Sequence, residues 1–521
     1  FGGSRSAQDS LCGGIALKAF ALPAFISSFV GIVMLSFGTR TNTSERLRDK
    51  EAFAGVALVW PIAVSIGSLP FWLGGVFNGP FTPDVALIDM ARGAVNAWFE
   101  SMSGFTTTGA TVISHNMSPN CIPGVTEDCI NSQPRGLLLW RSLTQWFGGM
   151  GIIMLGMMIL SRVIGGGMAL ARAELTGPSL SRLRPKLKQT AFALWTLYII
   201  LTFAEFVLLF GTGSMDLFDS INHSLTTLPT GGFSTHDASI GYYDSVLVEM
   251  IVVVFMFIAG VNFTLLWMFW EGDSKKALRD EEFRYYTIYI IVIVLAVAGA
   301  LIGSGTSVGK ALRDSLFQVV SIGTSTGFGS ADYMDPSWPL ATHLLIFILM
   351  IVGASAGSTG GGLKLLRVTL AFKVAMRELV RIAQPRKIER IRMNGEVVER
   401  NQIGLIVGML FVWVGLFGIS SIILSIFMPN TDFETVTTVV ASSLGNTGPA
   451  IGDFYGPSNT WAGMNSGALI ITSILMWFGR LELLTAVILM HPHTWRREEK
   501  VQSDRAAIAL FRRIMDDDDK S

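Results

Sequence analysis

Charged residues, cysteine and histidine are all scarce in this chain of 521 residues. Asp, Glu, Lys and Arg make up 15% of it, whereas water-soluble globular proteins carry about 25%. Three cysteines are too few for a disulfide-rich scaffold. The six histidines show no metal-ligand spacing with acids or cysteines, and no nucleophile motif or dinucleotide fingerprint occurs. The sequence therefore shows no set of catalytic residues, and we do not expect an enzyme. We also expect no organic cofactor and no nucleic-acid partner.

Long apolar runs dominate what is present. Half of the residues are hydrophobic, and the mean hydropathy is +0.50. A helix needs about 20 apolar residues to cross a bilayer, and the runs 53–77, 338–362 and 403–428 contain no charged residue. Further spans are expected at 19–37, 137–160, 191–211, 246–270, 285–301 and 461–490. The sequence thus predicts nine helical crossings, which is an all-α polytopic membrane protein.

The basic residues are unevenly distributed. Five stretches, 40–50, 162–188, 275–284, 364–400 and 496–520, contain 31 of the 39 lysines and arginines. By the positive-inside rule these are cytoplasmic, so the C-terminus is cytoplasmic. Nine spans then place the N-terminus outside, which leaves open a further span before Phe1. Acids outnumber basic residues in the outer stretches, either as a vestibule that concentrates cations or simply because outer loops are poor in Lys and Arg.

A Thr-Gly pair occurs four times between two apolar runs. The pairs are Thr108-Gly109, Thr230-Gly231, Thr326-Gly327 and Thr447-Gly448. Each follows a short, partly polar stretch typical of a half-helix, expected at 85–103, 216–225, 311–321 and 433–442. A dehydrated cation needs a ring of oxygen dipoles, and aligned carbonyls require backbone conformations that glycine adopts cheaply. The pattern predicts four pseudo-symmetric span–pore-helix–filter–span repeats around one pore.

The repeats give a domain division. An extra N-terminal transmembrane helix is expected at 11–39, and a cytoplasmic tail at 496–515. The run 516–521 contains DDDDK and is typical of an expression-tag remnant. The four repeats are expected at 51–164, 185–270, 281–383 and 398–495.

The second span of the third repeat is interrupted. Five glycines fall within residues 353–362, and each costs about 1 kcal/mol relative to alanine inside a helix. Irregular backbone at membrane depth lines a cavity or is buried in protein, so we expect a loop beside the pore. The alternative is close helix packing through small residues. A phosphate-binding loop is excluded, because no GK[ST] follows the glycines.

One arginine lies deep in the last span. Arg480, in the run WFGR, occupies the place that Gly149 has in the run WFGG of the first repeat. A charge at this depth costs at least ~2.5 kcal/mol if it faces lipid. We expect Arg480 to bond carbonyls of the glycine-rich loop and to add an electrostatic barrier; the alternative is an ion pair with Glu482 or Glu205.

The runs GFTTTGAT from Gly104, GGFSTHDAS from Gly231, GASAGSTGGGLK from Gly353 and WFGRLE from Trp477 resemble the Trk/Ktr/HKT superfamily of potassium transporters. The resemblance is closest to its TrkH branch and covers nearly the whole chain. It implies uptake of K⁺ and Rb⁺ through the inner membrane by a homodimer with one pore per protomer. It also implies regulation by a cytosolic nucleotide-binding ring of the TrkA type.

The resemblance also implies site residues. The ion-binding filter carries over onto Thr107, Thr108, Gly109, Pro229, Thr230, Gly231, Ser325, Thr326, Gly327, Asn446, Thr447 and Gly448. The intramembrane gate carries over onto Gly353, Gly357, Ser358, Thr359, Gly360, Gly361, Gly362, Lys364 and Arg480. No segment has the channel signature TVGYG, so we expect only moderate selectivity for K⁺ over Na⁺.

Several alternatives stay open. A carrier that couples K⁺ to H⁺ or Na⁺ needs membrane acids, and Glu100, Glu205 and Glu249 are candidates. The basic stretch 364–400 can dock an acidic partner or anionic lipid, or it can serve topology alone. His223 is expected to support the filter. Cys121 and Cys129 share an outer loop in which they can form a disulfide.

Overall fold

The structure is a computed structural model that describes residues 17–38, 49–151, 187–386, 390–398, 400–452 and 454–481. It is helical throughout, apart from one hairpin of two-residue strands, β1 (Arg392–Met393) and β2 (Glu396–Val397). The long helices are α2 (Leu22–Gly38), α3 (Asp49–Leu73), α8 (Leu187–Gly211), α13 (Glu281–Gly303) and α17 (Arg400–Phe427). The other paired helices are α5 (Arg135–Trp146), α10 (Val246–Ala259), α11 (Phe263–Trp270), α15 (Leu340–Ile351), α16 (Leu365–Ala383) and α19 (Ser466–Arg480).

Four of these helices are long and apolar enough to cross a membrane within the described residues, at 18–36, 191–211, 281–303 and 402–427. The bent pair α10–α11 makes a fifth candidate. The remaining expected crossings correspond to α3, with its apolar part Ala57–Leu73, and to the shorter helices α5, α15 and α19. Residues 152–160 and 482–490, which complete two of them in the prediction, lie outside the described residues. The chain is thus an all-α polytopic membrane protein, as predicted.

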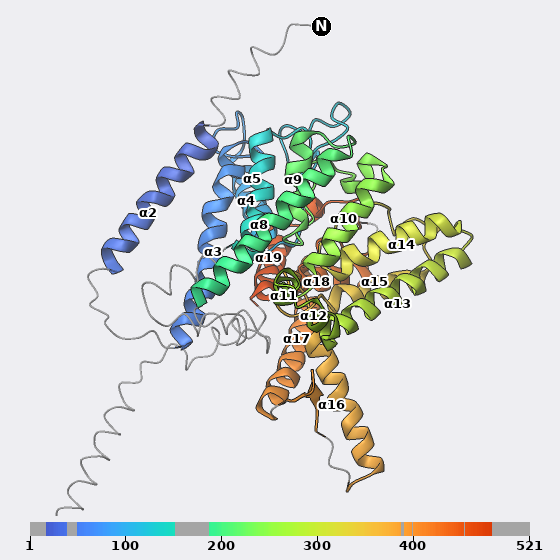
Figure 1. Ribbon diagram of the computed structural model, residues 1–521. Coiled ribbons are helices and arrows are strands. Elements are labelled where there is room, and N and C mark those ends of the chain that lie inside the picture. Colours follow the sequence, from blue (N-terminus) through green and yellow to red (C-terminus); the bar gives the residue numbers. More distant parts are fainter. Residues whose placement is uncertain are drawn as a thin grey trace, which may run out of the picture.

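Four shorter helices each follow a span and end inside the bundle: α4 (Leu87–Phe105), α9 (Leu217–Thr227), α14 (Val308–Gly323) and α18 (Phe433–Gly445). They match the expected half-helices to within a few residues. Their buried faces are unusually polar; on α9, for example, Asn222, His223 and Thr226 are all buried. Such faces point to a polar interior rather than to lipid. In Figure 1, α4 lies beside α3 and α5, and α18 lies beside α19.

The expected continuous helix at 246–270 was wrong. The chain bends by 103° between α10 and α11. Gly260 ends α10, where a β-carbon would run into the Tyr286 side chain. The side chain of Asn262 then caps α11 by accepting from the amide of Thr264 at 2.8 Å. Glycine followed by an Asn cap is a known stop-and-restart signal, but the apolar run around it masked this signal.

The expected crossing at 338–362 is a helix only as far as Ile351. Residues 352–364 form an irregular loop, as the cluster of glycines predicted, and the helix resumes as α16. This second helix lies in the basic stretch that was expected to be a cytoplasmic loop. In Figure 1, α16 and α17 extend together away from the rest of the bundle.

Candidate functional site

The chain makes the same tight turn at the end of each of the four half-helices. One residue in each turn takes the left-handed conformation: Thr107 (φ 52°), Thr230 (φ 55°), Ser325 (φ 60°) and Asn446 (φ 51°). Its amide bonds the carbonyl three residues back, and the next amide bonds the carbonyl five residues back. Left-handed backbone is costly for residues other than glycine, and clusters of such strain occur at functional sites. Four copies of one strained turn indicate one repeated function.

The backbone conformation shows that a different glycine of the second repeat matches the marker glycines of the other three repeats. A glycine of positive φ follows two residues after each left-handed residue: Gly109 (85°), Gly232 (77°), Gly327 (81°) and Gly448 (100°). Gly232, and not Gly231, is therefore equivalent to the other marker glycines. Gly231 occupies the position that threonine has in the other repeats, so matching Thr-Gly pairs by sequence shifted the register by one residue.

The four turns close into a ring. A β-carbon on Gly109 would run into the carbonyl oxygen of Gly231, and one on Gly232 into that of Thr326. Likewise, a β-carbon on Gly327 would meet the carbonyl oxygen of Thr447. The ring closes where a β-carbon on Gly448 would meet the carbonyl oxygen of Thr108. Each segment therefore packs directly against the next, in the order one, two, three, four, one, which is the quasi-fourfold arrangement that the repeats predicted.

A cavity of about 270 Å³ opens above this ring. Four of its lining residues are the positive-φ glycines Gly109, Gly232, Gly327 and Gly448. Asp237 is its only acidic lining residue among the described residues, beside Arg141 and two histidines, so it is not the acidic vestibule that the outer loops suggested. Several outer acids instead line a separate cavity of about 330 Å³, together with Lys310 and Arg313.

Buried polar side chains on the half-helices hold the extended segment of backbone that follows each turn. Glu100 accepts from the hydroxyl of Thr111 at 2.9 Å and from the amide of Val112 at 3.1 Å. His223 and Gln318, at the matching places on the second and third half-helices, bond Ser234 and Ala331 of their own extended segments. On the fourth half-helix Thr438, one residue before the matching place, bonds Ile451. The expected supporting contact of His223 is thus present, although the sequence did not identify its three counterparts.

Helix α5 connects the first two segments. Arg141 is buried, pairs with Glu100 at 2.7 Å and donates to the carbonyl of Ser234 at 2.9 Å. One turn later, the amide of Gln145 donates to the carbonyl of Gly231 at 2.6 Å, and its oxygen accepts from the amide of Phe233 at 3.1 Å. A β-carbon on Gly231 would overlap the Gln145 side chain. This overlap explains why the second repeat has glycine where the others have threonine.

The glycine-rich loop lies against the turns on the side opposite the cavity. The hydroxyl of Thr359 donates to the carbonyl of Leu228 at 2.9 Å, and the amide of Gly361 donates to the Ser325 hydroxyl at 2.6 Å. A β-carbon on Gly361 would collide with the carbonyl of Gly445. The loop therefore contacts the second and fourth segments just before their turns and the third at its left-handed residue, and the glycines permit this close approach.

Two basic side chains and one acid hold the loop. Lys364 donates to the carbonyl of Gly360, while Arg480 donates to that of Thr359 at 2.8 Å, as expected. Arg480 also donates to the carbonyls of Gly148 and Gly149, at 2.7 and 3.0 Å. From α13, Glu282 accepts from the amide of Ala356 at 2.5 Å, a contact that the sequence did not suggest. The loop is thus tied to all four repeats.

Comparison with known proteins gives a consistent picture. The family model of TrkH, a cation transport protein, matches residues 25–496. The chain belongs to the TrkH family. It is 35% identical over 483 residues to the Trk system potassium uptake protein TrkH of Escherichia coli (strain K12), with 92% of each chain covered. It is 30% identical to TrkG of the same organism, with 92% of this chain and 93% of TrkG covered.

A solved structure agrees with this assignment. The crystal structure of the potassium transporter TrkH from Vibrio parahaemolyticus superposes with a TM-score of 0.77 at 32% sequence identity, and 93% of each chain is covered. The range matched by the family model includes the half-helices, the turns and the glycine-rich loop.

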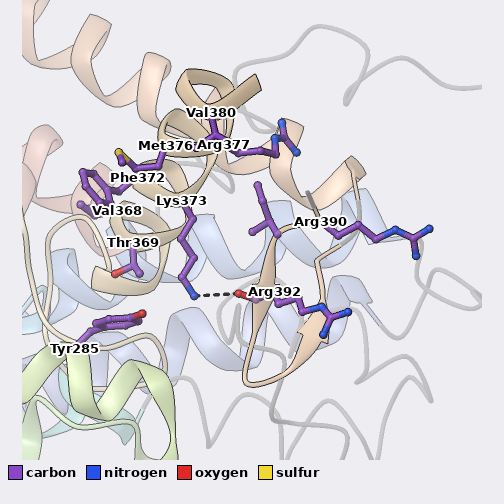
Figure 2. A pocket seen from close by; sticks show the side chains of 11 residues that line it. Tyr285, Val368, Thr369, Phe372, Lys373, Met376, Arg377, Val380, Arg390 and Arg392 are labelled. Carbon is purple, nitrogen blue, oxygen red and sulfur yellow. Dashed lines mark hydrogen bonds between the residues drawn. The ribbon is translucent and has the colours of Figure 1, made fainter. Parts of the chain in front are cut away.

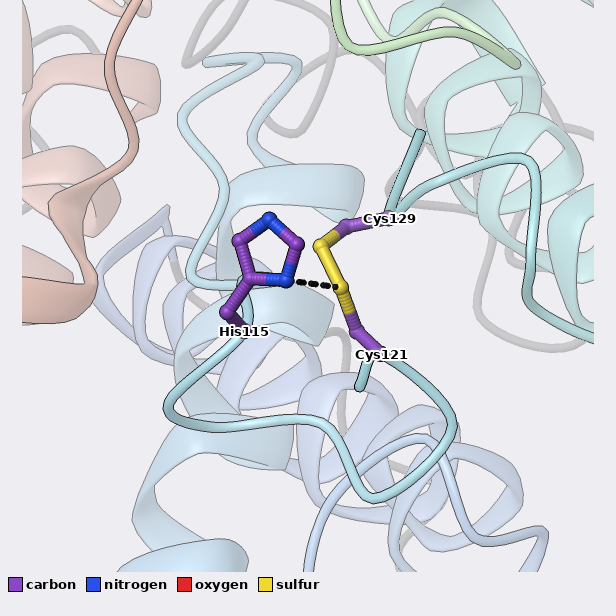
Figure 3. Close-up of side chains that lie close together, drawn as sticks. All are labelled: His115, Cys121 and Cys129. Atoms are coloured by element: carbon purple, nitrogen blue, oxygen red, sulfur yellow. Dashed lines mark hydrogen bonds between the residues drawn. A yellow bond between two sulfur atoms is a disulfide. The ribbon is translucent and has the colours of Figure 1, made fainter. Parts of the chain in front are cut away.

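The outer loop of the first repeat carries the predicted disulfide, between Cys121 and Cys129. Figure 3 shows His115 beside it, with Nδ1 at 3.1 Å from the Cys121 sulfur. Because the two sulfurs are bonded to each other, neither is the thiolate that binds metals. The disulfide loop is fixed to the second repeat, since Asp237 accepts from the amides of Cys129 and Ile130 at 2.7 and 3.0 Å.

A histidine between two carboxylates makes a second link between these loops. His236 Nδ1 lies 2.7 Å from Asp128, Nε2 lies 3.3 Å from Asp219, and the ring stacks on Tyr242. Burial alone would lower the pKa of His236, but the hydrogen bonds to Asp128 and Asp219 outweigh it and raise the pKa to about 9. At neutral pH the imidazolium donates to both acids and joins repeat one to repeat two at the outer mouth.

Proposed function

We propose that this chain takes up potassium across the cytoplasmic membrane, through a selective and gated pore formed by its four repeats. K⁺ and Rb⁺ pass the carbonyl oxygens of the four turn segments, which replace part of the hydration shell. The twelve filter residues predicted from the sequence are the proposed ion site, with Gly232 added in the second repeat. The single observation that carries the proposal is the closed ring in which each turn packs on the carbonyl of the next.

The half-helices assist in the proposed mechanism. The negative ends of their dipoles face the ring and favour a cation there. The family membership supports potassium as the substrate, because relatives that match over nine-tenths of the chain are potassium uptake proteins.

We propose the glycine-rich loop as the gate. Its residues Gly353, Gly357, Ser358, Thr359, Gly360, Gly361 and Gly362, together with Lys364 and Arg480, form the proposed gate set. The loop covers the end of the pore that faces the basic, cytoplasmic segments, and Arg480 places a positive charge beside it. A cation leaving the filter meets both barriers, so the loop must move before it can pass.

The assembly in this proposal is a homodimer with one pore per protomer and a cytoplasmic C-terminus. A cytosolic ring similar to TrkA binds the cytoplasmic face, where nucleotide binding would move the loop. The four repeats keep the boundaries 51–164, 185–270, 281–383 and 398–495.

Coupled symport with H⁺ or Na⁺ is the second candidate, and Glu205 favours it. This side chain is fully buried on α8, within a helix that is long and apolar enough to cross the membrane. Glu100 and Glu249 are instead paired with Arg141 and Arg313. Among the described residues Glu205 is thus the one of the three acids that no arginine pairs, and a coupling site needs such an acid inside the membrane.

Flux through reconstituted vesicles tests both functions. Purified protein in vesicles loaded with KCl should accumulate tracer Rb⁺ from outside, without any pH or Na⁺ gradient, and external K⁺ should compete better than Na⁺. Absence of Rb⁺ uptake, or equal competition by Na⁺ and K⁺, would overturn potassium-selective uptake. Uptake that appears only with a pH or Na⁺ gradient, and is lost in Glu205→Gln, would establish the symporter.

A further inference from the structure

A cavity of about 650 Å³ lies away from the pore, between α16, the start of α13 and the strand β1. Figure 2 shows its two unlike sides. Phe372, Met376 and Val368 of α16 lie on one side, near Tyr285. The guanidinium groups of Arg377, Arg390 and Arg392 extend toward the other. The cavity is therefore amphiphilic, with an apolar wall and a cationic rim.

The apolar wall continues along α16. Phe372 is 65% exposed and Met376 44%, and they are followed by Leu379 at 59% and Ile382 at 79%. The spacing of four, three and three residues puts these side chains on one helix face. Large apolar side chains that form a continuous exposed stripe mark a binding surface or a membrane contact.

Among the described residues, two of the basic side chains on the cationic rim are paired with acids, and two arginines are not. Arg377 pairs with its neighbour Glu378, and Lys373 is held by Glu281 at 2.7 Å and the carbonyl of Arg392 at 3.0 Å. Arg390 and Arg392 are exposed, and neither forms an ion pair with any other described residue. Arginine is suited to a phosphate, because its planar fork matches the phosphate oxygens.

The position of the cavity relative to the spanning helices indicates what kind of molecule fills it. The helix α16 starts directly after the re-entrant loop, and Tyr285 is in the first turns of the spanning helix α13. The cavity therefore lies where the bundle leaves the membrane on its basic, cytoplasmic side. Basic pockets between helices at this level attract anionic lipid headgroups. An acidic protein would be drawn to the arginines, but it would leave the apolar stripe uncovered.

We propose that this cavity binds an anionic glycerophospholipid of the cytoplasmic leaflet. Arg390 and Arg392 hold the phosphate group, and an acyl chain lies along Phe372 and Met376. Because Lys364, which holds the glycine-rich loop, directly precedes α16, a lipid bound here contacts the helix that leads directly from the proposed gate. The binding itself does not depend on potassium selectivity, so it can be tested whether or not the chain transports potassium.

Native mass spectrometry of the purified full-length chain tests the proposal. The protein is titrated with phosphatidylglycerol and, separately, with phosphatidylcholine that has the same acyl chains. We expect retained phosphatidylglycerol adducts and few phosphatidylcholine adducts. The double variant Arg390→Gln/Arg392→Gln should bind phosphatidylglycerol about 30-fold more weakly, because each basic residue near an anionic membrane contributes about a fivefold preference. The matched control Lys275→Gln/Arg279→Gln removes the same charge outside the cavity and should bind like the wild type.

Two further measurements separate the alternatives. Phe372→Ser/Met376→Ser keeps the arginines and should weaken phosphatidylglycerol binding severalfold if an acyl chain lies on this wall. Soluble glycerol phosphate should not compete. Equal adducts with both lipids, an unaltered arginine double variant, or full competition by glycerol phosphate would each overturn the lipid site. All four substituted residues are exposed, and thermal unfolding in detergent should verify that each variant folds.

Discussion

The guanidinium of Arg480 donates a hydrogen bond to the carbonyl of Thr359 at 2.8 Å, although 121 residues separate the two in sequence. The same side chain bonds the carbonyls of Gly148 and Gly149. One arginine thus joins the glycine-rich loop to the first repeat. A hydrogen bond to a charged group contributes about 1.5–3 kcal/mol, so this residue is a main restraint on the loop.

Replacing Arg480 should release the proposed gate. In Arg480→Ala the loop loses its bond at Thr359, and the positive charge disappears from the ion path. We expect basal Rb⁺ flux per molecule to rise severalfold in vesicles at matched protein content. Arg480→Lys is the control, because it keeps the charge but cannot reach three carbonyls. An unchanged or lower flux in Arg480→Ala would contradict a restraining role.

Gly109 should be essential for the filter. Its φ is +85°, and a β-carbon there would run into the carbonyl of Gly231. In Gly109→Ser we expect the ring to distort and the preference for K⁺ over Na⁺ to fall about tenfold, which corresponds to ~1.4 kcal/mol. Competition of Na⁺ against tracer Rb⁺ measures this preference. Gly124→Ser provides the matched control, since Gly124 has φ +76° but nothing within 4 Å of its β-carbon position. Equal losses in both variants would mean that only backbone strain matters.

Gln145 should affect selectivity without contacting the ion. Gln145→Leu leaves the carbonyl of Gly231 and the amide of Phe233 without their partners, and each buried unsatisfied group costs about 1–3 kcal/mol. The second segment should therefore lose its fixed position, with a lower K⁺ preference and little change in total cation flux. Ser142→Ala, on the same helix face, removes a bond to Asn222 of the half-helix instead of to the turn. If both variants kept the wild-type preference for K⁺, the two hydrogen bonds of Gln145 to the second segment would have no role in selectivity.

Much of this architecture could be predicted from the sequence, because apolar length and glycine placement act locally. Residues 85–103 and 433–442 were expected to be half-helices on these grounds, and the structure has helices there. The register of the second turn could not be predicted, because Thr230, Gly231 and Gly232 offer two alignments. The backbone conformation and the packing of Gly232 on the carbonyl of Thr326 decide between them, and the overlap of Gly231 with Gln145, 86 residues away, agrees. The roles of Arg141 and Glu282 likewise depend on partners that only the fold brings into contact.

The outer disulfide should contribute to stability. Its two cysteines are separated by 8 residues in sequence, and closing so short a loop contributes about 2 kcal/mol in the chain-entropy model. Cys121→Ser/Cys129→Ser should therefore lower the thermal midpoint in detergent. Cys12→Ser, which removes the third cysteine, should not. Maleimide labelling after denaturation gives a second readout, and the wild type should expose one thiol without reductant and three with it. Three reactive thiols without reductant would contradict the bond.

The contacts of His236 with Asp128 and Asp219 should make the stability of the folded protein sensitive to alkaline pH. The pKa of this histidine is raised from 6.5 to about 9 by Asp128 and Asp219, so the folded state holds a proton that the unfolded chain releases. For a raised pKa the stabilisation is complete below about pH 6.5 and is lost as the pH rises through about 9. We expect the thermal midpoint of the wild type to fall over this range relative to His236→Gln, which has no proton to lose at this position. His115→Gln, in the neighbouring loop, should follow the wild type. Parallel curves for wild type and His236→Gln would show that the two carboxylates do not hold the imidazolium.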